Sequence, residues 1–420
     1  MKITLTQFRP NTAEAVWTDC FAQAIAELHK AGGGVLTVPT GEYSTGPIEL
    51  CSNIELHLEP GAVIRFLNDP AAFPLQECQY EGRISHRPKP CLSAYHAENV
   101  ALTGSGVLDG CGAPWWAAQR ARTLANGRPY LLHFENVTHL RVCGVQLRNS
   151  PAWTVHPLNC VDVLIEDVSI CNPYNSPNTD GINPESCRDV RILNCRVDVG
   201  DDCITLKSGT EETPSPVPCE NIVIANCLLV HGHGGIVIGS EMSGGVRNVT
   251  VTNCVFTGTD RGLRVKTRRR RGGCVENLRL SNLVMERVFC PFVFNMYYSC
   301  GTAEKDRWVW EKTPYPVDGG TPAFRNIRIN GVTVVGATAS AGFFYGLAES
   351  PIDGLSLTDC HIEMARGAAP EKPAMMGNLE PMSARGFFLR NAKNVEFHNV
   401  TLKNADGEAY DTDESVDGEF

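Results

Sequence analysis

The chain has 420 residues, of which 43% are hydrophobic and 20% charged, a balance typical of a globular protein. Its net charge of −10 argues against a nucleic-acid partner. No stretch approaches the roughly 18 consecutive apolar residues of a membrane span, and the first ten residues lack the apolar core of a secretory signal. We therefore expect no membrane association and a cytoplasmic location, unless a leader has been removed.

The 18 cysteines could form disulfides, but their positions favour another interpretation. Many lie inside apolar runs at repeat-equivalent places, where cysteine serves as a small buried hydrophobe. Examples are Cys143, Cys195, Cys227, Cys254 and Cys360. No Cys-x-x-Cys pair occurs, so the sequence predicts no zinc site. In a cytoplasmic protein we expect most of these thiols to stay reduced.

The N-terminal region predicts a cap of about 60 residues. Residues 13–31 are expected to form one amphipathic helix, ended by the glycines at 32–34. Its apolar face carries Trp17, Phe21, Ala24, Ile25 and Leu28. Short strands follow at 35–39 and 54–58. Residues 68–92 are rich in proline and have no clear period, which predicts an irregular loop over one face.

From about residue 98 a short apolar motif recurs, usually at a step in the twenties. It starts at residues 100, 140, 163, 190, 222, 249, 278, 327, 355 and 395. A repeat of strand, turn and strand at this step, with no helix between copies, predicts a parallel β-helix. Leucine-rich repeats have a similar period, but their leucine pattern is absent. The recurring Asn or Asp at the strand end suits a left-handed turn in which stacked amides bond to one another. We predict an all-β domain over residues 1–405 and a disordered acidic tail over 406–420.

A second strand in each coil can be aligned between neighbouring coils. The aligned segments are 153–156, 182–185, 204–207, 236–239 and 263–266. Because side chains alternate along a strand, two columns face the core, including Trp153, and two face outward. The outward columns contain Lys207, Arg264 and Lys266, and they make His156 a candidate substrate contact.

Polar residues gather just before these strands. Asp180, Asp201 and Asp202 come from two neighbouring coils, which lie about 4.8 Å apart. His233 follows on the next coil, and Arg264 and Lys266 on the one after. Clustered carboxylates repel one another and keep one of them protonated near neutral pH, as cleavage of a glycosidic bond requires. The basic pair suits a substrate that carries carboxylates. Calcium binding by the aspartates is the main rival interpretation.

Four motifs in this stretch resemble those of glycoside hydrolase family 28, the polygalacturonase family. They are Asn178-Thr179-Asp180, Gly200-Asp201-Asp202, Gly232-His233-Gly234 and Arg264-Val265-Lys266. The resemblance covers roughly residues 13–400. It implies a right-handed parallel β-helix with an N-terminal capping helix, hydrolysis of galacturonan with inversion, and neither a metal nor another cofactor.

The resemblance also implies roles for individual residues. Asp201 would be the general acid, and Asp180 and Asp202 would orient and deprotonate the attacking water. His233 would hold the acid in the right protonation state. Arg264 and Lys266 would bind a galacturonate carboxylate, Asn178 would support the site, and either Tyr297 or Tyr298 would be the family tyrosine. Adjacent coils about 4.8 Å apart lie closer to the spacing of a retaining enzyme than of an inverting one.

The residues around 149–157 and 178–186 look like the bacterial exo-acting branch of the family. An exo-enzyme needs one end of its groove blocked, and the loop at 68–92 and an insertion at 300–322 are the candidates. The basic run Lys266–Arg271 next to the site is expected to bind an anion. Hydrolases of rhamnogalacturonan or xylogalacturonan, a calcium-dependent pectate lyase and a non-catalytic binding protein are the alternatives. The sequence does not indicate an oligomeric state.

Overall fold

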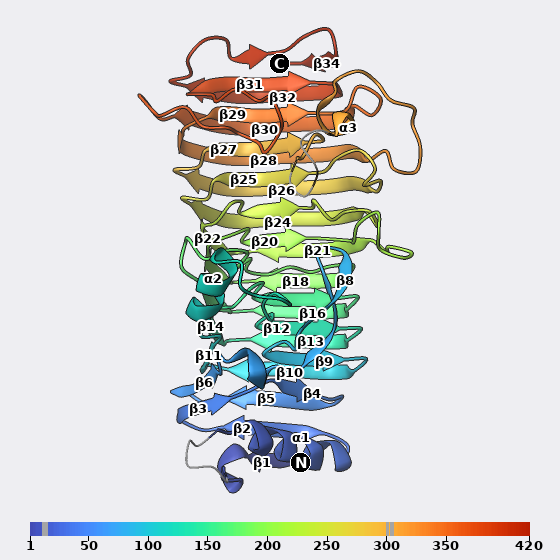
Figure 1. Ribbon diagram of the computed structural model, residues 1–420. Coiled ribbons are helices and arrows are strands. Elements are labelled where there is room, and N and C mark those ends of the chain that lie inside the picture. Colours follow the sequence, from blue (N-terminus) through green and yellow to red (C-terminus); the bar gives the residue numbers. More distant parts are fainter. Residues whose placement is uncertain (11–15, 300–301, 303–305) are drawn as a thin grey trace. The chain divides into compact units, whose positions relative to one another are not determined.

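The computed structural model describes residues 1–10, 16–299, 302 and 306–420 (Figure 1). Strands make up 51% of the chain, and it divides into two compact units, Met1–Asp201 and Asp202–Phe420. Each unit is built from stacked coils of parallel strands, the arrangement of a parallel β-helix. Among the described residues, no helix combines the length and the apolar character needed to cross a membrane.

In the first unit each coil contributes up to three strands, and each strand pairs in parallel with its equivalents in the neighbouring coils. One row is β1 (Lys2–Thr4), β2 (Gly34–Val38), β5 (Ile54–Leu58), β10 (Glu98–Gly104), β13 (Thr138–Cys143), β16 (Val161–Glu166) and β18 (Arg188–Leu193). A second is β3 (Gly41–Thr45), β6 (Ala62–Phe66), β11 (Val107–Asp109), β14 (Gln146–Arg148), β17 (Ser169–Cys171) and β19 (Arg196–Val199). The third is β4 (Ile48–Leu50), β9 (Leu92–Tyr95), β12 (Leu132–Glu135) and β15 (Val155–Leu158).

Helix α1 (Thr18–Lys30) packs against β2 and β4, where the first coils would otherwise expose their core (Figure 1). It is shorter than predicted: residues 13–15 lie outside the described residues, and Val16 pairs with Ser44 instead of joining the helix. Trp17 therefore sits at the N-cap and packs edge-on against Tyr43, with ring centres 4.9 Å apart. Two further short helices are η1 (Leu5–Gln7) and α2 (Ala113–Arg120).

The region 68–92 is not the irregular loop that its composition predicted. After η2 (Pro70–Ala72) it forms an antiparallel hairpin of β7 (Leu75–Tyr80) and β8 (Arg83–Pro88). Glu81 and Gly82 form the turn, with φ of 50° and 75°, which is the backbone that a tight two-residue hairpin requires. Their positive φ angles were not visible in the composition, so the hairpin was missed.

The second unit has longer strands. β21 (Cys219–Ala225) and β22 (Leu228–His231) both pair with the single strand β24 (Val246–Thr257). The row continues through β26 (Cys274–Glu286), β28 (Ala323–Ala337), β30 (Ile352–Met364), β32 (Ala392–Lys403) and β34 (Val416–Glu419). The other row is β20 (Ile204–Leu206), β23 (Ile236–Ile238), β25 (Arg261–Lys266), β27 (Cys290–Asn295), β29 (Ser340–Tyr345), β31 (Arg385–Arg390) and β33 (Tyr410–Asp411). Helix α3 (Arg307–Trp310) lies in an insertion after β27.

The predicted asparagine turns are present, and they stack. At the predicted strand end, Asn226, Asn253 and Asn282 have φ of 59°, 56° and 54°, and Asn253 and Asn282 each donate to the asparagine before them, over 3.2 and 2.8 Å. A second column, which the sequence did not single out, lies just before the apolar motif: Asn221, Asn248, Asn277 and Asn326, with φ between 54° and 59°. Each amide in this column donates to the preceding one, over 3.0, 3.0 and 2.6 Å. Asparagine tolerates the left-handed conformation, and its short amide satisfies its neighbour. This explains why the repeat ends on the same residue type coil after coil.

The tail at 406–420 is ordered, contrary to the prediction. It contains β33 and β34, and its aromatic residues cover the last coil. Tyr410 stacks on Phe387 with ring centres 5.6 Å apart, and Phe420 packs edge-on against Phe397 at 5.5 Å. Burial of these rings supplies the apolar contact that an acidic segment lacks on its own.

The predicted register of the second strands is right in the second unit and shifted in the first. Ile204 pairs with Ile236, which pairs with Leu263, as the alignment required. In the first unit Ile182 pairs with Val155 instead of Trp153, a shift of two residues. A shift of two keeps every side chain on its predicted face, because the strand period is two. The exception is Trp153, which precedes β15 and does not take its predicted place in the core column: it is buried under the hairpin, against Cys78 and Tyr130.

Candidate active site

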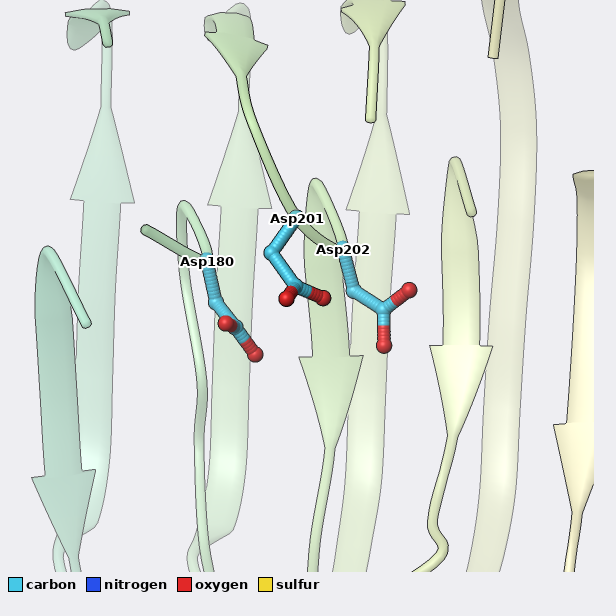
Figure 2. A group of neighbouring side chains, drawn as sticks. All are labelled: Asp180, Asp201 and Asp202. Carbon is cyan, nitrogen blue, oxygen red and sulfur yellow. The ribbon is translucent and has the colours of Figure 1, made fainter. Parts of the chain in front are cut away.

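Asp180 and Asp201 lie close together in the first unit. Their carboxylate oxygens come within 4.8 Å of one another, and Figure 2 shows the two side chains side by side on the loops that carry them. Asp180 is only 4% exposed, and its Oδ2 accepts a hydrogen bond of 3.1 Å from the Nδ2 of Asn183. The backbone carbonyl of Asp180 accepts from the amide of Thr154 at 2.8 Å, which anchors it to the neighbouring coil.

Asn178 is positioned by a residue that the sequence analysis missed. Its Oδ1 accepts from Nη2 of Arg128 over 2.7 Å, and Nη1 of Arg128 donates to the carbonyls of Pro151 and Pro177. Arg128 is 2% exposed, and burial lowers its pKa although the nearby Asp180 opposes that effect. It lies between the repeated strands, so no period identified it. Asn178 is expected to support the site, and the buried guanidinium of Arg128 in turn holds Asn178 in place.

The second unit begins with Asp202, the residue after Asp201, and here the predicted residues meet. Nη1 of Arg264 contacts Oδ1 of Asp202 at 3.0 Å, and Nζ of Lys266 contacts Oδ2 at 2.7 Å. All three side chains are at least nine-tenths buried. Burial alone would favour the neutral acid, but Lys266 and Arg264 outweigh it and hold the pKa of Asp202 well below its ordinary value. Asp202 is therefore an ionised carboxylate over the whole working range of pH.

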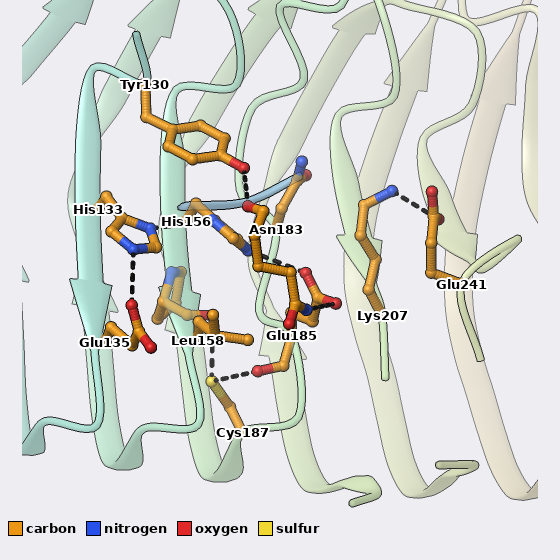
Figure 3. Close-up of polar contacts among 12 residues, drawn as sticks. Tyr130, His133, Glu135, His156, Leu158, Asn183, Glu185, Cys187, Lys207 and Glu241 are labelled. Carbon is orange, nitrogen blue, oxygen red and sulfur yellow. Dashed lines mark hydrogen bonds and ion pairs between the residues drawn. The ribbon is translucent and has the colours of Figure 1, made fainter. Parts of the chain in front are cut away.

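Arg264 and Lys266 are two buried cations that both contact one carboxylate, Asp202. Burial and the neighbouring Arg264 lower the pKa of Lys266, so a further anion would relieve the repulsion between the two cations. The nearby Lys207 is paired with Glu241, with Nζ and Oε2 3.0 Å apart (Figure 3). Arg264 and Lys266 are therefore the side chains of this unit that suit an acidic ligand.

His233 is oriented by Asp260. Its Nδ1 lies 2.8 Å from Oδ2 of Asp260, whose same oxygen also accepts from Arg261. A donated Nδ1 proton leaves Nε2 as the nitrogen for exchange with another partner. The His233 side chain is 53% exposed, as a group that meets a substrate must be. Asp260 stood beside the predicted column but was not assigned a role.

The structure separates the two candidate tyrosines. The Tyr298 ring centre lies 5.4 Å from Nζ of Lys266 and 5.9 Å from the guanidinium carbon of Arg264. Tyr297 points to another neighbour, Lys312, whose Nζ lies 3.3 Å from its ring centre. Tyr298 is therefore the tyrosine that accompanies the basic pair.

A loop between β30 and β31 also reaches these residues. Nη2 of Arg264 contacts the sulfur of Met375 at 3.2 Å, and Asn295 donates to the Met375 carbonyl at 3.1 Å. Arg261 donates to the carbonyls of Lys372 and Pro373. This segment has no repeat pattern, so nothing in its sequence identified it as part of the site.

The prediction for His156 was wrong, and three arginines of the basic run are engaged within the fold. His156 faces outward as expected but is fully buried, because the hairpin β7–β8 covers it. In the basic run, Arg268 and Arg271 share Glu211, and Arg269 binds Glu349 at 2.6 Å. Lys266, the first residue of the run, instead contacts Asp202.

The contacts of the carboxylates bear on the calcium alternative. Asp180 and Asp201 are near enough to share a cation. Asp202 has a cationic side chain on each oxygen, so it has a counter-charge of its own.

Comparisons with known proteins agree with this geometry. The sequence profile of the glycosyl hydrolases family 28 matches residues 35–367. The chain belongs to glycosyl hydrolase family 28. A probable polygalacturonase of Vitis vinifera is 30% identical over 363 residues, which are 84% of this chain and 72% of that protein.

Solved structures show the same fold for this family 28 protein. The crystal structure of a hyperthermoactive exopolygalacturonase from Thermotoga maritima has a TM-score of 0.77 at 30% identity, covering 96% of this chain and 92% of that one. The family 28 exopolygalacturonase of Yersinia enterocolitica gives 0.79 at 19% identity, covering 100% and 78%, and supports the fold alone. The right-handed parallel β-helix and the glycosidase class that the sequence predicted are confirmed.

Proposed function

We propose that this family 28 protein hydrolyses α-1,4-galacturonosyl linkages in galacturonan and its oligosaccharides. One observation carries the proposal: two buried cations, Arg264 and Lys266, lie together beside Tyr298. An adjacent guanidinium and ammonium suit a sugar that carries a carboxylate. Relatives named polygalacturonase support the same substrate class.

The residues take distinct roles in the proposed reaction. Asp201 protonates the leaving oxygen. His233, oriented by Asp260, keeps Asp201 in the protonation state that this step requires. Asp202 stays ionised and, with Asp180, orients and deprotonates the attacking water. Arg264 and Lys266 bind the carboxylate of the sugar at the cleavage point. Such a carboxylate draws the two cations away from Asp202, which raises the basicity of Asp202 when substrate is present.

Cleavage from the chain end is the finer part of the proposal. Hairpin β7–β8 covers the outer face of β12 and β15, on the same side as Asp180. Tyr80 of the hairpin stacks on Trp153 with ring centres 4.8 Å apart, so a sugar cannot lie on that indole. A covered face next to the reacting carboxylates shortens the groove, as an exo-enzyme requires.

Assays of polygalacturonate test the reaction. We expect new reducing ends, no rise in absorbance from unsaturated products, and activity that survives EDTA. Unsaturated products, or loss of activity on chelation, would replace the hydrolase with a calcium-dependent lyase. Binding of polygalacturonate with no turnover would make the protein a non-catalytic binder.

Product analysis tests the finer statements. Oligomers longer than trigalacturonate should release galacturonate and the oligomer one residue shorter from the first turnover onward if the enzyme acts from the chain end. Proton NMR of the first product should show the inverted anomer. The retained anomer would instead make one carboxylate a nucleophile, a role compatible with oxygens as close as those of Asp180 and Asp201.

A further inference from the structure

A chain of buried polar groups lies under the hairpin, apart from the proposed catalytic residues (Figure 3). His133, His156 and Glu185 are each 0% exposed. Nε2 of His156 lies 3.0 Å from Oε2 of Glu185, and Nδ1 of His156 lies 3.1 Å from Nδ1 of His133. At the far end, Nε2 of His133 is 3.5 Å from Oε2 of Glu135. The three residues come from three successive coils, since His133 pairs with His156 and Leu158 pairs with Glu185.

The contact between the two imidazoles fixes where their protons lie. Two Nδ1 atoms 3.1 Å apart share one proton, so the rings together hold at most three and cannot both be imidazolium. We assign Nε2 of His156 as the donor to Glu185. In the other tautomer, the lone pair of an unprotonated Nε2 would face a carboxylate oxygen, which is repulsive. Glu185 is thus held in one position by a donor that cannot rearrange unless both rings change tautomer.

The second oxygen of Glu185 holds the hairpin. Oε1 accepts a 2.6 Å hydrogen bond from Nε2 of Gln79 in β7. Tyr130, stacked on His133 with ring centres 5.1 Å apart, donates its hydroxyl to the Gln79 carbonyl over 2.5 Å. Gln79 is therefore bound through both its side chain and its backbone to the covered face.

The next hairpin residue reaches the catalytic segment. Tyr80 stacks on Trp153, and Arg87 from β8 lies 3.9 Å from the Tyr80 ring centre. Arg87 donates to the carbonyl of Arg128, the residue that holds Asn178. The position of Gln79 thus determines where Tyr80 and Arg87 lie relative to the segment that carries Asp180.

An all-apolar contact would cover this face at lower cost. Burying an imidazole and a carboxylate requires desolvation that their mutual contact only partly repays. Hydrophobic side chains, however, allow a hairpin to slide, whereas a chain of directed hydrogen bonds fixes one register. The polar network therefore fixes the position of the hairpin precisely and adds little to the free energy of unfolding.

We propose that Glu185, oriented by His156 and His133, is a positioning residue that fixes hairpin β7–β8 and thereby restricts the enzyme to cleavage from the chain end. The inference rests on the proposed galacturonan hydrolysis. It assigns the end-specific cleavage to a buried hydrogen-bond network, whose members do not touch the reacting sugar.

The test uses Glu185→Ala and Gln79→Ala in the full-length protein, with trigalacturonate and polygalacturonate as substrates. Each change removes the hydrogen bond between Gln79 and Glu185: Glu185→Ala deletes the acceptor, and Gln79→Ala deletes the donor. We expect both to release oligomers from polygalacturonate, with a KM for trigalacturonate raised about tenfold and kcat within about threefold of the starting protein. The double variant should be no worse than either single change, because both remove one interaction.

Asp162→Asn is the matched control. It breaks another His–carboxylate contact of the same unit, His139 to Asp162 at 2.7 Å, on the exposed surface. Its products should remain galacturonate alone. Release of galacturonate alone by Gln79→Ala, with unchanged KM, would overturn the proposal, and Gln79 is an accessible hairpin residue whose replacement leaves the core intact. Absence of any hydrolysis by the unmodified protein would instead overturn the proposed function.

Discussion

Asp180 and Asp202 are carboxylates of the same proposed pair, yet their surroundings differ. Asp180 is held by the neutral amide of Asn183, and its segment is supported by Arg128 through Asn178. Asp202 is bound on both oxygens by charged groups, Arg264 and Lys266. One carboxylate is fixed by hydrogen bonds and the other by ion pairs, although both are almost fully buried.

This difference predicts that substitutions at the two positions affect the free energy of unfolding differently, even where they affect activity alike. A buried carboxylate with two cationic partners cannot be neutralised without leaving those partners unpaired. A carboxylate that accepts a hydrogen bond from an amide can be replaced by asparagine, which loses the charge but can still accept that bond. The two positions should therefore respond alike in activity and differently in stability, which gives the following comparisons a clear expected order.

The largest effect is expected from Asp202→Asn compared with Asp180→Asn. Both changes remove a proposed catalytic carboxylate, so kcat should fall by about 10²–10⁴-fold in each. Only Asp202→Asn leaves Arg264 and Lys266 buried without their anion, which should lower the free energy of unfolding by about 3–5 kcal/mol. Urea denaturation and initial rates on polygalacturonate measure the two quantities. Equal stability losses would contradict the division drawn above.

The second comparison concerns pH. Because the pKa of Asp202 is lower in the folded than in the unfolded chain, its ionisation adds stability above the unfolded pKa of about 4, and the gain is lost as pH falls further. Lys266→Met removes one cause of that shift. The acid loss of stability should then be smaller and end at a higher pH than in the starting protein, and kcat/KM should fall by about 100-fold because carboxylate binding is weakened. Denaturation curves from pH 2 to 7 measure the shift.

A change at Asp180 provides the contrast to the pH experiment. Asn183→Leu removes an amide that carries no charge. Because Asp202 keeps both of its cations, its part of the acid loss of stability should remain while kcat falls. Loss of that part would contradict the assignment of the acid step to Asp202.

The repeated parts of the molecule could be predicted from the sequence. Strand alternation and the recurring Asn and Cys positions identified the coils, and the register of Ile204, Ile236 and Leu263 followed from them. The placement of Arg264 and Lys266 beside Asp202 depends on that register alone. Motifs at fixed positions in a repeat are predictable because each coil repeats the same backbone.

The non-repeated parts could not be predicted in this way. Arg128, the hairpin turn at Glu81 and Gly82, and the Met375 loop act through single tertiary contacts that have no period. His156 illustrates the consequence. Its face was predicted correctly, but its burial depends on a hairpin whose sequence indicated only a loop. Local alternation reports the face of a strand and not what covers that face.

A smaller effect is expected at Arg128, which acts through Asn178. Arg128→Lys keeps the positive charge but loses the fork that reaches both Asn178 and the carbonyls of Pro151 and Pro177. We expect kcat to fall by about tenfold, with stability lowered by about 1–3 kcal/mol for the carbonyls left unpaired. KM for galacturonate oligomers should stay near its original value, because Arg264 and Lys266 are untouched. A rise in KM with constant kcat would instead place Arg128 against the substrate.

The smallest effect on stability and activity should come from changes in the asparagine column, which has no proposed role in catalysis. Asn248→Gly keeps the left-handed backbone but removes the amide that bonds to Asn221 and Asn277. The two lost contacts are exposed, so the free energy of unfolding should fall by only about 0.5–1.5 kcal/mol, with kcat and KM unchanged. Asn248→Ala adds the strain of a Cβ at a φ of 58° and should cost about 1 kcal/mol more. If the glycine variant were the weaker of the two, the backbone would matter less at this turn than the amide ladder, and the recurrence of asparagine would need a different cause.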